Sequence, residues 1–337
     1  MSARATLTPL GAVLLSVLAT GALAEPIALS NASPLARLAG PPVAQPARLT
    51  RRGDTALSLL VAVASHSASS MRGDEQLLLD GETWETTVIV RRGLANGLEL
   101  GLELPLIVHE NGVFDPAIDA YHDLTGLPGG ERDAMATNQL GYLYRTADGR
   151  RFRLDNPASG LGDLSVYAAL PLLAGDHPQA PALSLRGGVR LPTGDDDRWL
   201  GNGAFGLSLA LAGTRSFRLL GYDGDLYARV GLLAPAVAGG AVLDDVQETL
   251  AGYATVAMRW HRWRRLSLSL QFDSNTALWD SAISDVGKAP LQVLVGGEWR
   301  PGRAPSGKSV VAFGFAEDLA IDRSPDIAFF VNWRRRY

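Results

Sequence analysis

The sequence predicts an all-β protein, a closed antiparallel transmembrane β-barrel of about twelve strands. Three observations carry this prediction. Apolar and polar residues alternate with a period of two over stretches of about ten residues. The connections between these stretches alternate between short and long, and an apolar segment typical of exported proteins precedes them.

The composition excludes several classes of protein. The formal net charge of −4 argues against a nucleic-acid partner, because phosphate binding needs a basic surface. The chain has no cysteine, which excludes disulfides, thiol chemistry, cysteine-based zinc sites and a lipoprotein anchor. The remaining balance, 47% hydrophobic and 20% charged, is compatible with a membrane barrel that has a polar interior.

The first residues predict a signal peptide over 1–24. Arg4 precedes an apolar core at 10–18, and Ala22-Leu23-Ala24 matches a small-x-small cleavage site. The mature chain would then begin at Glu25. A membrane-anchoring helix is the alternative, but the apolar core is shorter than the ~20 residues that a spanning helix needs.

Residues 25–53 predict an extended periplasmic lead-in segment. Ser33-Pro34, Gly40-Pro41-Pro42 and Gln45-Pro46 interrupt any regular structure in this stretch.

Residues 54–337 predict the outer-membrane β-barrel itself. In the clearest stretch, 265–273, the apolar face carries Leu266, Leu268, Leu270 and Phe272, and Ser267, Ser269, Gln271 and Asp273 lie on the other face. The length of each stretch is close to the roughly nine to eleven residues that a tilted membrane strand requires. The predicted strands are 54–65, 82–92, 97–108, 163–173, 182–192, 203–212, 224–234, 250–260, 264–273, 290–300, 308–317 and 326–335.

The connections predict the orientation of the barrel. The connection at 93–96 is short and the next, 109–162, is very long, with room for an extra hairpin at 138–153. Short periplasmic turns and long outer loops are typical of barrels in the Gram-negative outer membrane. We therefore expect both termini to be periplasmic. The last strand alternates and ends on the aromatic Tyr337, which resembles an assembly signal of outer-membrane proteins.

The strand register predicts which charged side chains line the lumen. An Arg facing the lipid midplane would cost roughly 2–4 kcal/mol, so the charged residues within strands should point inward. The predicted lumen-lining residues are Glu99, Glu103, Arg186, Arg190, Arg229, Arg259, Asp273 and Glu298. Twelve strands fall between barrels filled by side chains and wide channels. The Glu and Arg side chains could close the lumen by pairing or could line a narrow pore, and the sequence leaves both open.

The long loop contains the residues predicted to form a plug or gate, Asp119, His122, Asp123 and Arg132. No metal site is predicted there, because the histidine spacing matches no compact metal motif. Asp195, Asp196 and Asp197 are interpreted as a solvated acidic turn. The tryptophans, mostly near strand ends, are interpreted as interfacial girdles.

No catalytic residue is predicted. Ser65 and His66 are adjacent in a strand, so their side chains point to opposite faces and cannot form a nucleophile–base pair.

Three stretches carry a resemblance to a known family. They are residues 118–132 of the long loop, Gly160-Leu161-Gly162-Asp163-Leu164 together with Leu191-Pro192-Thr193-Gly194-Asp195, and Ser324-Pro325-Asp326-Ile327-Ala328-Phe329. They resemble a proteobacterial family of unknown function, number 3187, over nearly all of the mature chain. The second pair is also similar to outer-membrane transporters of aromatic-compound degradation. The resemblance implies an outer-membrane barrel and no agreed activity.

The leading functional interpretation is a channel for the passive passage of a small, organic solute. One alternative is a structural or partner-binding barrel whose lumen is closed by loop 109–162, and another is an outer-membrane lipid-modifying enzyme. The expected partners are outer-membrane lipid, the barrel-assembly machinery during biogenesis and the solute, with no nucleic acid and no cofactor.

Overall fold

The computed structural model describes residues 25–112, 139–175, 180–219, 221–301, 309–319, 325 and 327–337. The predicted signal peptide and the predicted gate residues Asp119, His122, Asp123 and Arg132 lie outside these ranges. No helix in the described residues has the length and hydropathy needed to cross a membrane.

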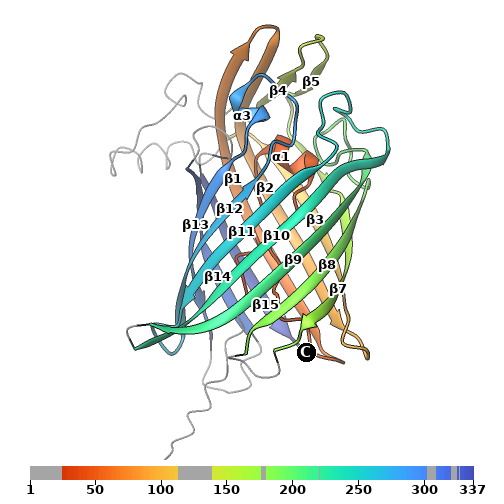
Figure 1. Cartoon of the computed structure of the whole chain (residues 1–337). Coiled ribbons are helices and arrows are strands. Elements are labelled where there is room, and N and C mark those ends of the chain that lie inside the picture. The colour runs from red at the N-terminus through yellow and green to blue at the C-terminus, as the bar shows by residue number, and fades with distance from the viewer. Residues whose placement is uncertain are drawn as a thin grey trace, which may run out of the picture.

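The described chain forms one antiparallel sheet that closes into a twelve-stranded barrel (Figure 1). The predicted fold class is therefore confirmed. Closure comes from β1 and β15, which pair from Ala56↔Arg336 to Ser65↔Ile327. The barrel strands are β1 (Thr55–Arg72), β2 (Glu75–Gly93), β3 (Glu99–Glu110), β7 (Leu164–Leu173), β8 (Ala182–Leu191), β9 (Ala204–Leu219), β10 (Tyr222–Gly239), β11 (Ala251–Trp260), β12 (Leu266–Asn275), β13 (Leu291–Trp299), β14 (Ser309–Asp318) and β15 (Ile327–Arg336).

Three shorter strands extend the sheet at one end of the barrel. They are β4 (Gly141–Arg145), β5 (Arg151–Leu154) and β6 (Ala158–Leu161). The β4–β5 hairpin pairs with the first residues of β2, and β6 pairs with the last residues of β3. The hairpin falls almost wholly within the stretch 138–153, where the sequence has room for one. The helices within the described residues are short, α1 (Pro34–Ala39) and α3 (Ser284–Gly287).

The two faces of the wall differ as the alternation requires. In β12, Gln271 is fully buried, and its neighbour Phe272 is 38% exposed. Exposed large apolar side chains occur on eleven of the twelve barrel strands, for example Leu59, Leu100, Val166, Val189, Leu207, Leu226, Val256, Leu268, Val295, Phe313 and Val331. The outer surface is therefore an apolar belt, and the polar residues of the strands are turned to the interior.

Not every tryptophan belongs to a girdle. Three tryptophans lie near the C-terminal ends of β11, β13 and β15, as interpreted from the sequence. They are Trp260, Trp299 and Trp333. Trp199 and Trp279 instead are almost fully buried, and Trp199 stacks on Phe152 with ring centroids 4.4 Å apart. The girdle interpretation is wrong for these two, because loop and hairpin residues cover them in an apolar cluster.

Candidate functional site

Residues 25–53, which we call the plug, lie inside the barrel (Figure 1). Most of the segment is buried. It makes hydrogen bonds to side chains of β2, β3, β8, β10, β12 and β15. A segment that contacts strands around the whole circumference can only lie within the lumen. This differs from the periplasmic lead-in expected from the sequence.

The plug enters and leaves through the same end of the barrel. Glu25 contacts Arg336, the last residue of β15. The segment then runs to α1, deeper in the lumen, and returns to Thr50, which bonds Glu99 at the start of β3. Gly53 donates its backbone N–H to the Gly93 carbonyl at the end of β2, 3.0 Å away, just before β1 begins.

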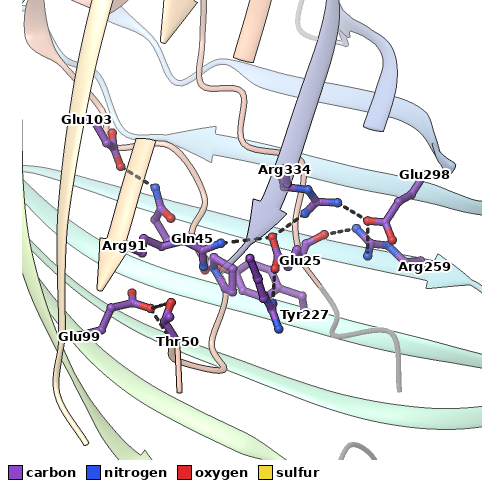
Figure 2. Close-up of polar contacts among 12 residues, drawn as sticks. Glu25, Gln45, Thr50, Arg91, Glu99, Glu103, Tyr227, Arg259, Glu298 and Arg334 are labelled. Atoms are coloured by element: carbon purple, nitrogen blue, oxygen red, sulfur yellow. Dashed lines mark hydrogen bonds and ion pairs between the residues drawn. The ribbon is translucent and has the colours of Figure 1, made fainter. Parts of the chain in front are cut away.

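An ion-pair cluster holds the first residue of the plug (Figure 2). The Glu25 carboxylate lies 2.6 Å from Arg334, 2.6 Å from Arg336 and 3.3 Å from Arg91. Its backbone carbonyl accepts a hydrogen bond from Arg259. Burial alone would raise the pKa of Glu25, but the three guanidinium groups together hold it well below its ordinary value. Glu25 is therefore an anion at neutral pH.

Helix α1 ends at a tight contact with the wall. Gly40 closes the helix in the left-handed conformation, with φ +73°, and its N–H bonds the Ala36 carbonyl. Arg190 lies against Gly40 and donates to the carbonyls of Leu38 at 2.6 Å and Pro235 at 2.9 Å. A side chain at position 40 would collide with that guanidinium.

The returning limb of the plug is held largely by its backbone. Arg229 donates to the carbonyls of Pro42 at 3.0 Å and Val43 at 2.7 Å. Tyr227 donates to the Gln45 carbonyl, and the Gln45 amide donates to Glu103 at 2.5 Å (Figure 2). Because peptide carbonyls accept these bonds, much of the wall's positive charge is satisfied by neutral groups.

Apolar packing fixes the plug between the polar contacts. Ile27, Leu29 and Ala32 form one buried cluster with wall residues such as Leu60 and Phe330. A second cluster takes in four residues of α1, Leu35, Ala36, Leu38 and Ala39. These side chains could not remain in water without cost, which is the physical reason that the segment is inside.

The structure places the predicted lumen-lining residues around the plug. Glu99 bonds Thr50 and lies 2.9 Å from Arg186, and Arg186 also donates to the Pro46 carbonyl. Glu103, Arg190 and Arg229 contact the plug as described above. Arg259 donates to the Glu25 carbonyl and lies 2.9 Å from Glu298. Asp273 accepts from Gln271, which bonds both the N–H and the carbonyl of Ile27.

Sequence reasoning missed six charged members of the site. They are Glu25 and Arg37 in the plug, and Glu85, Arg91, Arg334 and Arg336 in the wall. Arg37 forms a buried ion pair with Glu85 of β2. The alternation within their strands would have turned Arg91 and Arg334 inward, so that signal was present. Nothing in the sequence pattern of 25–53 marked Glu25 or Arg37.

A cavity of about 130 Å³ remains between the plug and the wall. Pro41, Val43 and Gln45 line it from the plug, and Glu103, Arg186 and Arg229 line it from the wall. Two of its arginines stack on tyrosines, Arg186 on Tyr167 at 4.6 Å and Arg229 on Tyr253 at 4.8 Å. Within the described ranges, no group of three His, Asp or Glu side chains is placed to hold a metal ion.

Similar solved structures share the barrel fold. An outer-membrane channel from Pseudomonas putida F1 aligns with a TM-score of 0.50 and 15% identity, over 86% of this chain and 97% of that one. The Pseudomonas putida toluene transporter TodX aligns with a TM-score of 0.36 and 11% identity, over 84% and 87%. The porin NanC gives 0.41 and 7%, over 82% and 97%.

Among curated proteins, no sequence matches the chain. A family model matches residues 3–337, which is nearly the whole sequence and agrees with the resemblance carried by its three motifs. The chain therefore belongs to the family described as "Protein of unknown function (DUF3187)".

Proposed function

We propose that the protein is a gated outer-membrane channel for the passive passage of a small solute, closed at rest by the plug. The observation that carries this proposal is the plug itself. It is a chain segment that lies in the lumen of a closed barrel, and it is covalently continuous with the wall only where Gly53 leads into β1. Its contacts are the kind that water and solute can replace. Arg190, Arg229 and Tyr227 hold backbone carbonyls, which a hydrated lumen would exchange for water at modest net cost.

The outer surface supports a membrane location. Leu209, Val230 and Leu232 are about half exposed on neighbouring strands, which is costly in water and favourable in lipid. Trp299 and Trp333 face outward at one rim, where aromatic rings favour the lipid interface. The barrel begins and ends at this same rim. Because the sequence predicts a signal peptide over 1–24 and the turns on this side are short, we assign the rim to the periplasm.

The size of the remaining cavity supports gating over a permanently open pore. About 130 Å³ holds several water molecules or one small ring, so the passage of a larger solute needs the plug to move. The plug, and not a direct pairing of wall charges, blocks the path. A barrel whose lumen served only as a structural core would need no separate segment to fill it. Outer-membrane lipid and the barrel-assembly machinery remain proposed partners on the strength of the fold.

Single-channel recording tests the proposal. The full chain should show rare, brief conductance steps in a planar bilayer, and a variant lacking 26–49 should show long-lived ones. Arg218→Gln removes an exposed ion pair with Asp223 outside the lumen and should behave as the full chain does. Absence of conductance in the deletion variant, with its barrel folded, would contradict a channel and favour a closed structural or partner-binding barrel.

A further inference from the structure

The contacts of Glu25 describe a built carboxylate site. One oxygen of the carboxylate accepts from Arg336. The other accepts from Arg334 and Arg91 (Figure 2). Arg91 is 4% exposed and Arg334 is 9% exposed, so the wall holds both guanidinium groups in place. Planar guanidinium groups on both oxygens are the arrangement that proteins use to recognise carboxylates.

The wall around this site has more positive than negative charge. Glu298 is the wall carboxylate that pairs with Arg259 and Arg334, and it also pairs with Arg300. Arg91 and Arg336 pair with Glu25. In the described residues, these ion pairs set two carboxylates, Glu25 and Glu298, against five guanidinium groups.

Removal of Glu25 from the site would therefore take from Arg91 its carboxylate acceptor and leave Arg334 with Glu298 alone. A buried charge that loses its partner is strongly destabilising, much more so than a surface charge. Any state in which the plug moves away from this end leaves these arginines to water or to another anion in the same place. The site consequently favours anions over neutral molecules whenever Glu25 is absent.

The residues after Glu25 indicate what kind of anion fits. Pro26 and Ile27 line a small gap next to the arginines. The wall lines this gap with apolar or aromatic residues, Tyr227, Ala257 and Met258, and with polar ones, Asp225, Arg259, Ser269 and Gln271. The plug thus presents a carboxylate followed directly by an apolar body. A molecule of the same pattern, a carboxylate on a small apolar or aromatic body, would occupy both parts of the space.

We propose that the Arg91–Arg334–Arg336 cluster is a binding site for the carboxylate of a small apolar organic acid, and that Glu25 occupies it as a tethered substitute while the plug is docked. This deepens the proposed function, on which its role in transport rests, by assigning a solute class to the barrel end where Glu25 and the last residue of β15 lie. Binding itself does not depend on conduction.

Chemical rescue of Glu25→Ala in the full chain tests the site. The probes are benzoate, its neutral isostere benzamide, acetate and chloride, all at equal ionic strength. Titration calorimetry should give a Kd for benzoate at least tenfold lower in Glu25→Ala than in the unaltered protein, because the tethered competitor is gone. Acetate and benzoate should also raise the thermal midpoint of this variant, and benzamide should not.

Three variants complete the experiment. Asp223→Ala removes an exposed carboxylate at the same barrel end and should gain no affinity for benzoate. Glu25→Ala with Arg334→Gln should lose the gain. Glu25→Gln keeps the volume of the plug and replaces Glu25→Ala if the latter fails to assemble, with the same expected gain for benzoate.

Equal benzoate binding with and without Glu25, or equal binding of benzamide, would overturn the proposal. Chloride binding as tight as benzoate binding would do so too, because it would show a general anion site. Conduction without benzoate binding would contradict this inference alone. Benzoate binding to a barrel that never conducts would contradict the proposed channel alone.

Discussion

Replacing Gly40 with alanine tests how the plug is held in the lumen. The left-handed backbone at φ +73° would cost an alanine about 1 kcal/mol. The new Cβ would lie 2.0 Å from Arg190 Nη1, so the guanidinium must move. Its hydrogen bonds to Leu38 and Pro235 are then lost, each contributing about 1.5 kcal/mol because the donor is charged.

Together these losses destabilise the docked plug by about 4 kcal/mol. Since about 1.4 kcal/mol changes an equilibrium constant tenfold, the equilibrium constant for local opening of the plug should rise roughly a thousandfold. Amide hydrogen exchange followed by mass spectrometry reads that equilibrium directly. Peptides covering 25–53 should lose protection by this factor or down to the unprotected limit. Peptides from β11 and β12, which do not touch Gly40, should keep theirs.

Gly53→Ala is the matched control. Gly53 also has a left-handed backbone, φ +84°, but an added Cβ there meets nothing within 4 Å. It carries the backbone strain without the collision, so protection of 25–53 should fall by about tenfold or less. If Gly40→Ala and Gly53→Ala changed protection equally, Arg190 would not anchor the plug and the reasoning would fail.

Three further predictions follow from the wall and the plug. Leu209→Arg, on the outer face at mid-barrel, should lower the free energy of unfolding in lipid by roughly 2–4 kcal/mol, whereas Leu173→Arg at a strand end should cost about 0–1 kcal/mol, both measured by urea titration. Thr50→Val removes the hydroxyl donor to Glu99 and should reduce protection of 48–53 by about tenfold, for a bond to a charged group of about 1.5 kcal/mol. Because the pKa of Glu25 is lower in the docked plug than in the free carboxyl group, ionised Glu25 stabilises docking. This stabilisation is complete at any pH above the ordinary carboxyl pKa, and it is lost as the pH falls through the depressed value. Protection of 25–30 should therefore hold at pH 5 and fall only in stronger acid, and a loss between pH 7 and 5 would contradict the cluster.

The period of two predicted the barrel strands well because lipid and lumen impose opposite polarities on alternate residues. All twelve predicted spans overlap barrel strands, and most ends agree within a few residues. The main differences are in strand length. β1 continues to Arg72 and β2 begins at Glu75, beyond the predicted 65 and 82. Residues 64–68 of β1 are all buried, so buried and exposed positions do not alternate in this part of the strand.

The location of the plug could not be predicted in the same way. The prolines of 25–53 show that the segment lacks regular structure, and apart from α1 it does. They do not show where an irregular segment goes. Two signals were present in combination: Ile27, Leu29, Leu35 and Leu38 would be costly to leave in water, and several inward arginines needed acceptors. To connect these two signals, one must know which wall carbonyls and side chains lie opposite each residue of the plug.

The common end of the plug's two limbs has a consequence for biogenesis. Glu25 and Thr55 both lie beside the last residues of β15, so the segment folds into the barrel as a doubled-back loop. No terminus has to be drawn through the barrel from one mouth to the other. Pairing of β1 with β15 can therefore come first and docking second, and the order of these events is not dictated by topology. If docking comes second, a newly assembled barrel passes through an unplugged stage before residues 25–53 enter it.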